Sequence, residues 1–447
     1  MDDDLLTIGK KYGMTRRDFL LLTSLSAAGF VIGCATSPVT GEKQLMLVSE
    51  EQEIQIDKQN SPHQFSADYG TIQDEALNDY INRTGTKIAA RTHRAHMPYS
   101  FRVVNANYVN AYAFPGGSIA CTRGILLSLE NEAELTALLG HELGHVNARH
   151  TAQQMSKGVL IQAVVGGLSA LAGTQGAAYG QLASQLGMFG VRALLASYSR
   201  DNEREADALG MKYMYRGGYN PSGMVGLMDM LKGLSKSKPN TIELMFATHP
   251  MSEERYQTAV KTSQSKSKYK SAETFPLHRE RYMDHTAKLR ILKPAIDEMQ
   301  EGEKKMMQKK FDKAETHFKK ALKLAPTDYT GFVMMSTCKL YQKKYKEGIT
   351  YAEKAKQVYP QEAQAYHLSG FAKISTKDFD GGYQDFSAYE KLLPGNPNTI
   401  FFKGYAQEGM KHTKNAANEY KRYLQFTSQG KMAEYAYKRL KQWGYYK

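Results

Sequence analysis

The feature that most constrains the fold of this chain is an interval of 34 residues that recurs through its last third. Four sets of positions share it: Gly302, Ser336, Gly370 and Gly404; Phe311, Tyr345 and Phe379; Ala314, Gly348, Gly382 and Ala416; and Pro326, Pro360 and Pro394. Because so many positions keep one period, the segment is expected to be an array of similar units rather than an unrelated helical bundle.

Each unit has small residues early, an aromatic residue in the middle and a proline at its end, which is typical of tetratricopeptide repeats (TPRs). Two helices can approach closely at small residues, and proline ends the second helix. We expect an all-α TPR solenoid over 286–447, with about four repeats and a capping helix at 431–443. Such arrays bind extended protein segments on a concave surface, so this half is predicted to be a binding module.

The first 34 residues have the pattern of an export signal. Arg16 and Arg17 precede an apolar run that begins at Phe19 and is too short to span a bilayer comfortably. A basic region followed by a short apolar core is typical of a secretory signal, and the arginine pair indicates the twin-arginine route. The run ends in VIGC, which is similar to a bacterial lipobox, so Cys34 is predicted to be lipidated. An uncleaved anchor, or cleavage without a lipid, is the alternative.

Residue 35 is not an aspartate that would retain a lipoprotein at the inner membrane, so we expect an outer-membrane anchor that faces the periplasm. Residues 158–191 contain no charged residue. Their many Gly and Gln residues make a transmembrane hairpin a poor fit. We favour a helical hairpin packed over the neighbouring domain, and contact with the membrane surface is the alternative.

The chain between these regions mixes helices with a few strands. Residues 75–95 have helical periodicity, and 100–125 predict two or three short strands with a turn at Pro115-Gly116-Gly117. Asn131 is expected to cap a helix that continues to about Met155. Helices resume over 192–233, and a linker is expected near 262–285.

Residues 141–145 read HELGH and fit the pattern HExxH, which is short enough to arise by chance. On a helix, His141 and His145 lie on one face and can bind the same metal. Neutral imidazoles suit Zn²⁺. Glu142 would then lie toward the open side of the metal, where it can take a proton from water.

A catalytic zinc also needs a third protein ligand. Glu203 and Asp207 are four residues apart in SRDNEREAD (199–207), so they share a helical face that excludes Glu205. One carboxylate would bind the metal and the other would accept the ring N–H of a ligand histidine. The spacing alone is equally consistent with an exposed acidic turn.

The two motifs HELGHVNARH (141–150) and SRDNEREAD resemble those of the gluzincin family that includes the CAAX prenyl endopeptidases, the protease HtpX and the mitochondrial protease OMA. Residues 37–53, the stretch NAYAFPGG at 110–117 and the repeats are most similar to its TPR-containing periplasmic members. The resemblance implies that His141, His145 and Glu203 bind zinc. It also implies that Glu142 is the general base and that Asp207 supports the site.

The same resemblance extends to residues around the site. It implies that the strand at Asn110, Ala111, Tyr112 and Ala113 binds the substrate backbone by strand addition. His249, in the segment THP, would steady the oxyanion or occupy the open zinc position; a surface-loop histidine is the alternative.

Structural roles are favoured for four further residues, with a functional role for Arg149 and His150, or a ligand role for Cys121, as the alternatives. Arg149 and His150 would end the catalytic helix. Cys121 is expected to be a buried, inert thiol, and Cys338 to lie in the core of a repeat.

We therefore expect an α+β fold: a mostly helical zincin-type metallopeptidase domain with a small β-sheet and one Zn²⁺ over 35–275, followed by the TPR solenoid. The predicted function is a zinc endopeptidase of the bacterial envelope. It would cleave unfolded or misassembled outer-membrane proteins, with the repeats recruiting substrate or an envelope partner such as the outer-membrane assembly machinery. A chaperone-like adaptor with a latent metal site is the alternative. The net charge of +14 is compatible with nucleic acid, but the export signal argues against that partner.

Overall fold

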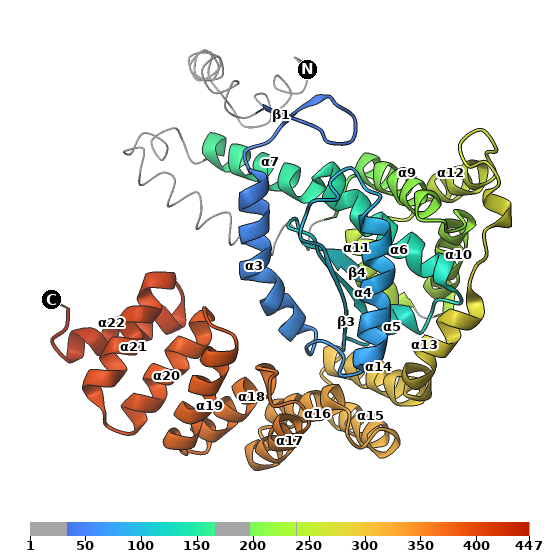
Figure 1. Cartoon of the computed structure of the whole chain (residues 1–447). Coiled ribbons are helices and arrows are strands. Elements are labelled where there is room, and N and C mark those ends of the chain that lie inside the picture. The colour runs from blue at the N-terminus through green and yellow to red at the C-terminus, as the bar shows by residue number, and fades with distance from the viewer. Residues whose placement is uncertain (1–33, 166–196, 238, 447) are drawn as a thin grey trace.

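The computed structural model describes residues 34–165, 197–237 and 239–446. They form an α+β part, from β1 to α13, and a helical repeat array, from α14 to α22, which lies against one side of it (Figure 1). The predicted signal segment before Cys34, and the uncharged segment beyond residue 165, lie outside the described residues. In the described ranges, no helix is both long and apolar enough to cross a bilayer.

The α+β part contains a three-stranded sheet of β3 (Ser100–Val104), β4 (Ala111–Ala113) and β5 (Ser118–Thr122). β4 and β5 form the predicted hairpin, which the Phe114 N–H closes by donating to the Ser118 carbonyl at 2.8 Å. β3 pairs with β5 in parallel, which the sequence did not indicate, so the strand order is β3-β5-β4 and β4 lies at an edge. Residues 34–45 add a separate pair, β1 (Cys34–Thr36) and β2 (Lys43–Leu45).

Helices surround the sheet. They are α3 (Glu50–Ala67), α4 (Glu75–Ala89), α5 (Arg123–Leu126), α6 (Glu132–Ala148), α7 (His150–Val165), α9 (Arg200–Arg216), α10 (Ser222–Ser237), α11 (Pro239–Thr248), α12 (Glu253–Ser263) and α13 (Arg279–Ile291). Every residue of α6 is buried, so this helix is the centre of the domain. Asn131 caps it as predicted, because the Asn131 side chain accepts from the Glu134 N–H.

The helices α6 and α9 pack unusually closely. A Cβ atom on Gly144 would lie 2.9 Å from Ala206 Cα, and one on Gly140 would lie 3.0 Å from the Gly210 carbonyl oxygen. The distance at Gly144 is too short for a Cβ atom and the one at Gly140 is at the limit, so glycine at these two positions permits the contact. The contact brings the two sequence motifs, one on each helix, face to face.

The predicted helix from Asn131 to Met155 is in fact two helices. α6 ends at Ala148, Arg149 adopts a left-handed conformation with φ of 61°, and α7 begins at His150. The Arg149 side chain is held by an ion pair with Glu53 at 3.1 Å and by a hydrogen bond to the Val48 carbonyl at 2.7 Å. Because these partners come from distant residues, the local periodicity did not reveal the break.

The segment expected as a linker near 262–285 packs against the α+β part. Tyr269, Ala272 and Tyr282 are buried in the main hydrophobic core. The Tyr282 hydroxyl, on α13, donates to the Leu126 carbonyl at 2.7 Å. The chain therefore reaches the repeat array through a helix that belongs to the first core.

The repeat array consists of four helix pairs and a final helix, and the predicted α+β organisation is confirmed. The pairs are α14 (Lys293–Met307) with α15 (Phe311–Leu324), α16 (Tyr329–Tyr341) with α17 (Tyr345–Val358), α18 (Gln364–Ser375) with α19 (Phe379–Leu392), and α20 (Pro397–Gly409) with α21 (Thr413–Phe426); α22 (Lys431–Gln442) covers the end. Within a pair the small residues let the helices meet: a Cβ on Gly302 would lie only 2.3 Å from the Phe318 ring.

The array is attached to the α+β part by buried polar contacts. Arg123 forms an ion pair with Asp328 at 2.7 Å, and both side chains are almost fully buried. Gln300 Nε2 donates to the Asn107 carbonyl at 2.7 Å, and Ser66 donates to Glu362. The first two repeats therefore dock on the strand and helix ends of the α+β part.

Candidate metal centre

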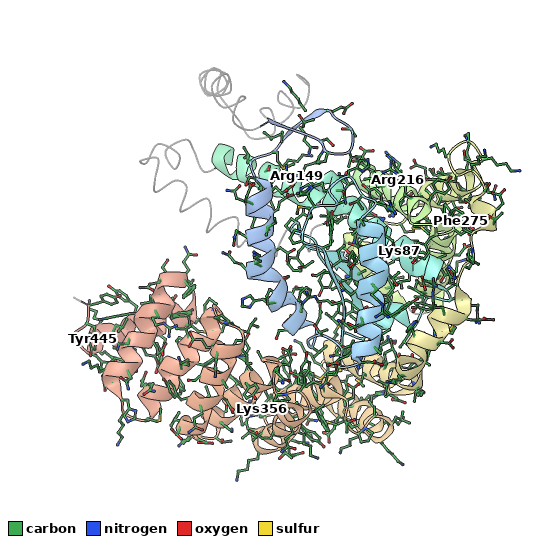
Figure 2. All side chains as sticks on the ribbon, viewed as in Figure 1. Lys87, Arg149, Arg216, Phe275, Lys356 and Tyr445 are labelled. Carbon is green, nitrogen blue, oxygen red and sulfur yellow. The ribbon has the colours of Figure 1, made fainter. Side chains whose placement is uncertain are left out.

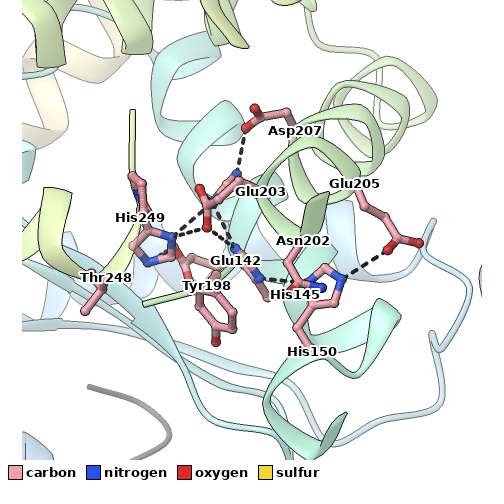
Figure 3. Close-up of polar contacts among 12 residues, drawn as sticks. Glu142, His145, His150, Tyr198, Asn202, Glu203, Glu205, Asp207, Thr248 and His249 are labelled. Atoms are coloured by element: carbon pink, nitrogen blue, oxygen red, sulfur yellow. Dashed lines mark hydrogen bonds and ion pairs between the residues drawn. The ribbon is translucent and has the colours of Figure 1, made fainter. Parts of the chain in front are cut away.

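Four buried side chains bring their donor atoms together where α6 meets α9. His141 Nε2 and His145 Nε2, on α6, lie 3.0 Å apart. Glu203, in the first turn of α9, places one oxygen 3.6 Å from His141 Nε2 and the other 3.4 Å from His145 Nε2. His249, just after α11, places Nδ1 3.1 Å from Glu203 Oε1 and 3.3 Å from His141 Nε2 (Figure 3).

These separations fit a zinc ion. Tetrahedral zinc with bonds of about 2.0–2.1 Å has its ligand atoms about 3.3 Å apart. The five separations given above are 3.0–3.6 Å, and one donor atom from each of the four residues lies within 4.8 Å of the others. Imidazole with carboxylate is a donor set that suits zinc. Glu142 Oε1 is buried without a hydrogen-bond partner in the protein, as expected beside a site that takes up an ion and a water.

A second layer of contacts supports this cluster. Asp207 Oδ1 accepts from His141 Nδ1 at 2.9 Å, as expected for a group that fixes the tautomer of a metal-binding histidine. Arg255, on α12, donates through Nε to Asp207 Oδ2 at 2.7 Å and forms an ion pair with Glu203 at 2.6 Å. Arg255 was not anticipated, since nothing in its local sequence distinguishes it from a surface arginine.

Burial and neighbouring charges set the protonation of the cluster. Burial lowers the pKa of His145 well below its usual value, which keeps the ring neutral and able to bind a metal. Burial also raises the pKa of Glu142, although His249 and His141 oppose this effect. For His249, burial acts to lower the pKa, but the carboxylates of Glu203 and Glu142 raise it overall.

The predicted substrate strand and the predicted general base line one pocket. Its walls are formed by Gln64, Tyr108, Asn110, Tyr112, Ala113, Glu142, Tyr198, Leu244, Thr248 and His249. Asn110 Oδ1 is buried there without a hydrogen-bond partner in the protein. Ala111 does not line this pocket; its side chain is buried in the hydrophobic core, to which Ala113 also belongs.

The remaining candidates lie outside the donor set. Cys121 and Cys338 are buried free thiols, as expected, and burial raises the pKa of both. Cys34 begins β1, opposite Leu45. Tyr198 was not anticipated: its ring stacks on that of His145 with centroids 3.9 Å apart.

Comparison with known proteins identifies the family of this site. The model of peptidase family M48 matches residues 75–263, a range that contains all four donor residues. Residues 75–263 form a peptidase family M48 domain. The match confirms the resemblance drawn from the motifs HELGHVNARH and SRDNEREAD.

Individual relatives match similar parts of the chain. Beta-barrel assembly-enhancing protease from Yersinia pestis is 31% identical over 201 residues, which cover 44% of this chain and 41% of that protein. Metalloprotease LoiP from Escherichia coli (strain K12) is 25% identical over 253 residues, covering 53% of this chain and 93% of that protein. The match thus spans less than half the length of the first relative.

A solved structure also overlaps part of the chain. YrrB, a TPR protein with an unusual peptide-binding site, has a TM-score of 0.32 and 14% sequence identity, and the overlap covers 47% of this chain and 99% of that one.

Proposed function

We propose that this M48 protein is a zinc-dependent endopeptidase of the bacterial cell envelope. The observation that carries the proposal is the convergence of His141, His145 and Glu203 beside the buried carboxylate of Glu142, at a pocket that also contains part of an edge strand. Zinc held by the two histidines and Glu203 would polarise a peptide carbonyl and lower the pKa of water.

Glu142 would act as the general base. Burial raises the pKa of this carboxyl group, which makes its carboxylate a stronger base, and Oε1 has no hydrogen bond to compete for a proton. Glu142 would take a proton from the attacking water and pass it to the nitrogen of the leaving amine. Asp207 and Arg255 would hold His141 and Glu203 in place through the contacts described above.

The substrate would bind in an extended conformation along β4. An edge strand can pair with an added strand through backbone hydrogen bonds, which favours unfolded segments over a particular sequence. Asn110, Tyr112 and Ala113 line the pocket next to Glu142, so a peptide paired with this strand would pass the catalytic group. Unfolded or misassembled outer-membrane proteins are the substrate class we propose.

His249 would regulate access to the metal. Its Nδ1 lies 3.1 Å from Glu203 Oε1 and 3.3 Å from His141 Nε2, the spacing expected of a fourth ligand. A protein ligand in this position would exclude the water and the substrate carbonyl, because a catalytic zinc needs an open position. We therefore favour a brake over an oxyanion role for His249.

The repeats would recruit an envelope protein, with outer-membrane assembly proteins as the candidate class. Residues 286–447 contain 30 Lys and Arg and 17 Asp and Glu, so nearly all of the net charge of +14 lies in the repeats. This balance favours an acidic partner surface. The proposed organisation is an export signal over 1–34 with a lipid on Cys34, a metallopeptidase domain over 35–275 and a TPR domain over 286–447, in the periplasm at the outer membrane.

The proposal is tested by cleavage of an unfolded protein such as casein, with and without a chelator, by the zinc-loaded chain. The expected result is chelator-sensitive cleavage. One alternative is a chaperone-like adaptor with a latent metal site. It is favoured by the position of His249, which as a fourth ligand would exclude water from the metal. That alternative predicts no cleavage by the zinc-loaded chain, even when His249 is replaced by alanine.

A further inference from the structure

The ring of His145 contacts a second histidine on the side away from the metal donors. His145 Nδ1 lies 2.9 Å from His150 Nδ1, and His150 Nε2 lies 3.1 Å from a carboxylate oxygen of Glu205 (Figure 3). His150 is fully buried and the Glu205 side chain is one-third exposed. Glu205 thus lies outside the metal site, as expected, but it is linked to that site through His150.

The protons along this chain of contacts can be assigned. When His145 uses Nε2 toward the metal, its one ring proton lies on Nδ1. His145 Nδ1–H then donates to His150 Nδ1, so the proton of neutral His150 lies on Nε2 and is donated to Glu205. Each ring nitrogen has one role, and the order Glu205–His150–His145 determines which nitrogen of His145 faces the metal.

The break in the backbone between α6 and α7 places the ring of His150 next to that of His145. Residues five apart do not share a face of a continuous α-helix, so the contact requires the break at Arg149. The left-handed conformation of Arg149, with φ of 61°, is unfavourable for a residue other than glycine. Its ion pair with Glu53 and its bond to the Val48 carbonyl hold it there, at the upper end of α3 (Figure 2).

We propose that His150 and Glu205 are positioning residues that orient His145 for metal binding. The inference rests on the proposed function, since it concerns the same zinc site. Each ligand histidine would then be oriented by a carboxylate. Asp207 contacts His141 directly, and Glu205 contacts His145 indirectly, through His150. Contacts of this kind raise metal affinity about 10- to 100-fold.

The test measures zinc affinity rather than cleavage, by competition between the full-length chain and a chromophoric chelator. His150→Leu keeps a buried side chain of similar size but removes both hydrogen bonds, and it should weaken zinc binding about 10- to 100-fold. The side-chain amide introduced by His150→Gln can accept a hydrogen bond from His145 and donate one to Glu205. The zinc affinity of this variant should therefore stay within a few-fold of that of the natural chain. A residue that only fills space would not show this rescue.

A second variant keeps the test valid if His150→Leu fails to fold. Glu205→Ala removes a partly exposed side chain and should weaken zinc binding several-fold, whereas the matched control Asp201→Asn, an exposed acid on the same helix, should not. The proposal is overturned if the natural chain binds one zinc and His150→Leu or Glu205→Ala binds it equally well. Failure of the natural chain to bind zinc would instead overturn the proposed function.

Discussion

His249 places Nδ1 3.1 Å from Glu203 Oε1, so a histidine outside both motif helices completes the set of donor atoms. If this histidine is a brake, His249→Ala should increase the cleavage rate of an unfolded protein severalfold, because it frees a position for water and substrate. The rate is measured on zinc-loaded protein. A rate that falls by tenfold or more would instead indicate that His249 steadies the oxyanion.

Asp207 supports the site through its bonds to His141 and Arg255. Asp207→Asn removes the negative charge that pairs with Arg255 and leaves His141 with a weaker acceptor, so zinc should bind about 10- to 100-fold more weakly. Competition with a chelator measures this, and Asp229→Asn, in an exposed part of α10, is the control. Equal zinc affinity in the two variants would exclude the supporting role.

The contact between the repeat array and the α+β part should weaken as the pH rises. Burial raises the pKa of Glu303, on α14, to about 7, although the charge of Arg123 and hydrogen bonds with Asn107 and Tyr69 act to lower it. Folded Glu303 therefore stays protonated at pH values where the unfolded chain, with a pKa of about 4.5, has lost the proton. The stability from this group is complete below pH 4.5 and is lost as the pH rises through 7, a change on the order of 3 kcal/mol.

Thermal unfolding between pH 5 and 9 measures this effect. The melting temperature should fall over the range, and Glu303→Gln should reduce the fall because the amide stays neutral. Glu301→Gln, an exposed acid on the same helix, should leave the pH dependence unchanged. If the melting temperature of Glu303→Gln falls with pH as much as that of the natural chain, Glu303 is not the source of the pH dependence.

Lysines in the turns of the repeats hold an unfavourable backbone conformation. Lys309, Lys343, Lys377 and Lys411 are 34 residues apart, and each has φ between 58° and 67°. Replacing each with glycine should stabilise the array by about 0.5–1 kcal/mol per site, because the gain at positive φ exceeds the added entropy of the unfolded chain. The fourfold variant should melt several degrees higher, and no increase would contradict this account. Lys320→Gly, in the middle of a helix, should lower the melting temperature.

Much of the architecture follows from periodic patterns in the sequence. The 34-residue interval predicts the four helix pairs, and the turn at Pro115–Gly117 predicts the β4–β5 hairpin, because both depend on nearby residues. The parallel pairing of β3 and the break at Arg149 could not be predicted in this way. They depend on β5 and on Glu53, which the local pattern does not connect to them.

In the candidate site, too, the contacts between nearby residues could be predicted and those between distant residues could not. Helical spacing places His141 beside His145 and Glu203 beside Asp207, but Arg255 reaches the site from α12, and no local pattern indicates its contact. One available signal was overlooked. Gly140 and Gly144 lie four residues apart on α6, and so do Ala206 and Gly210 on α9, a pattern that indicates closely packed helices.

The most direct test of the central claim is cleavage of an unfolded protein by the natural chain and by Glu142→Gln, with the zinc content of each measured. The account predicts about one zinc per chain in both proteins. It also predicts a cleavage rate at least 100-fold lower in the variant, which keeps the ligands but lacks the base. Unchanged cleavage by zinc-loaded Glu142→Gln would contradict the account.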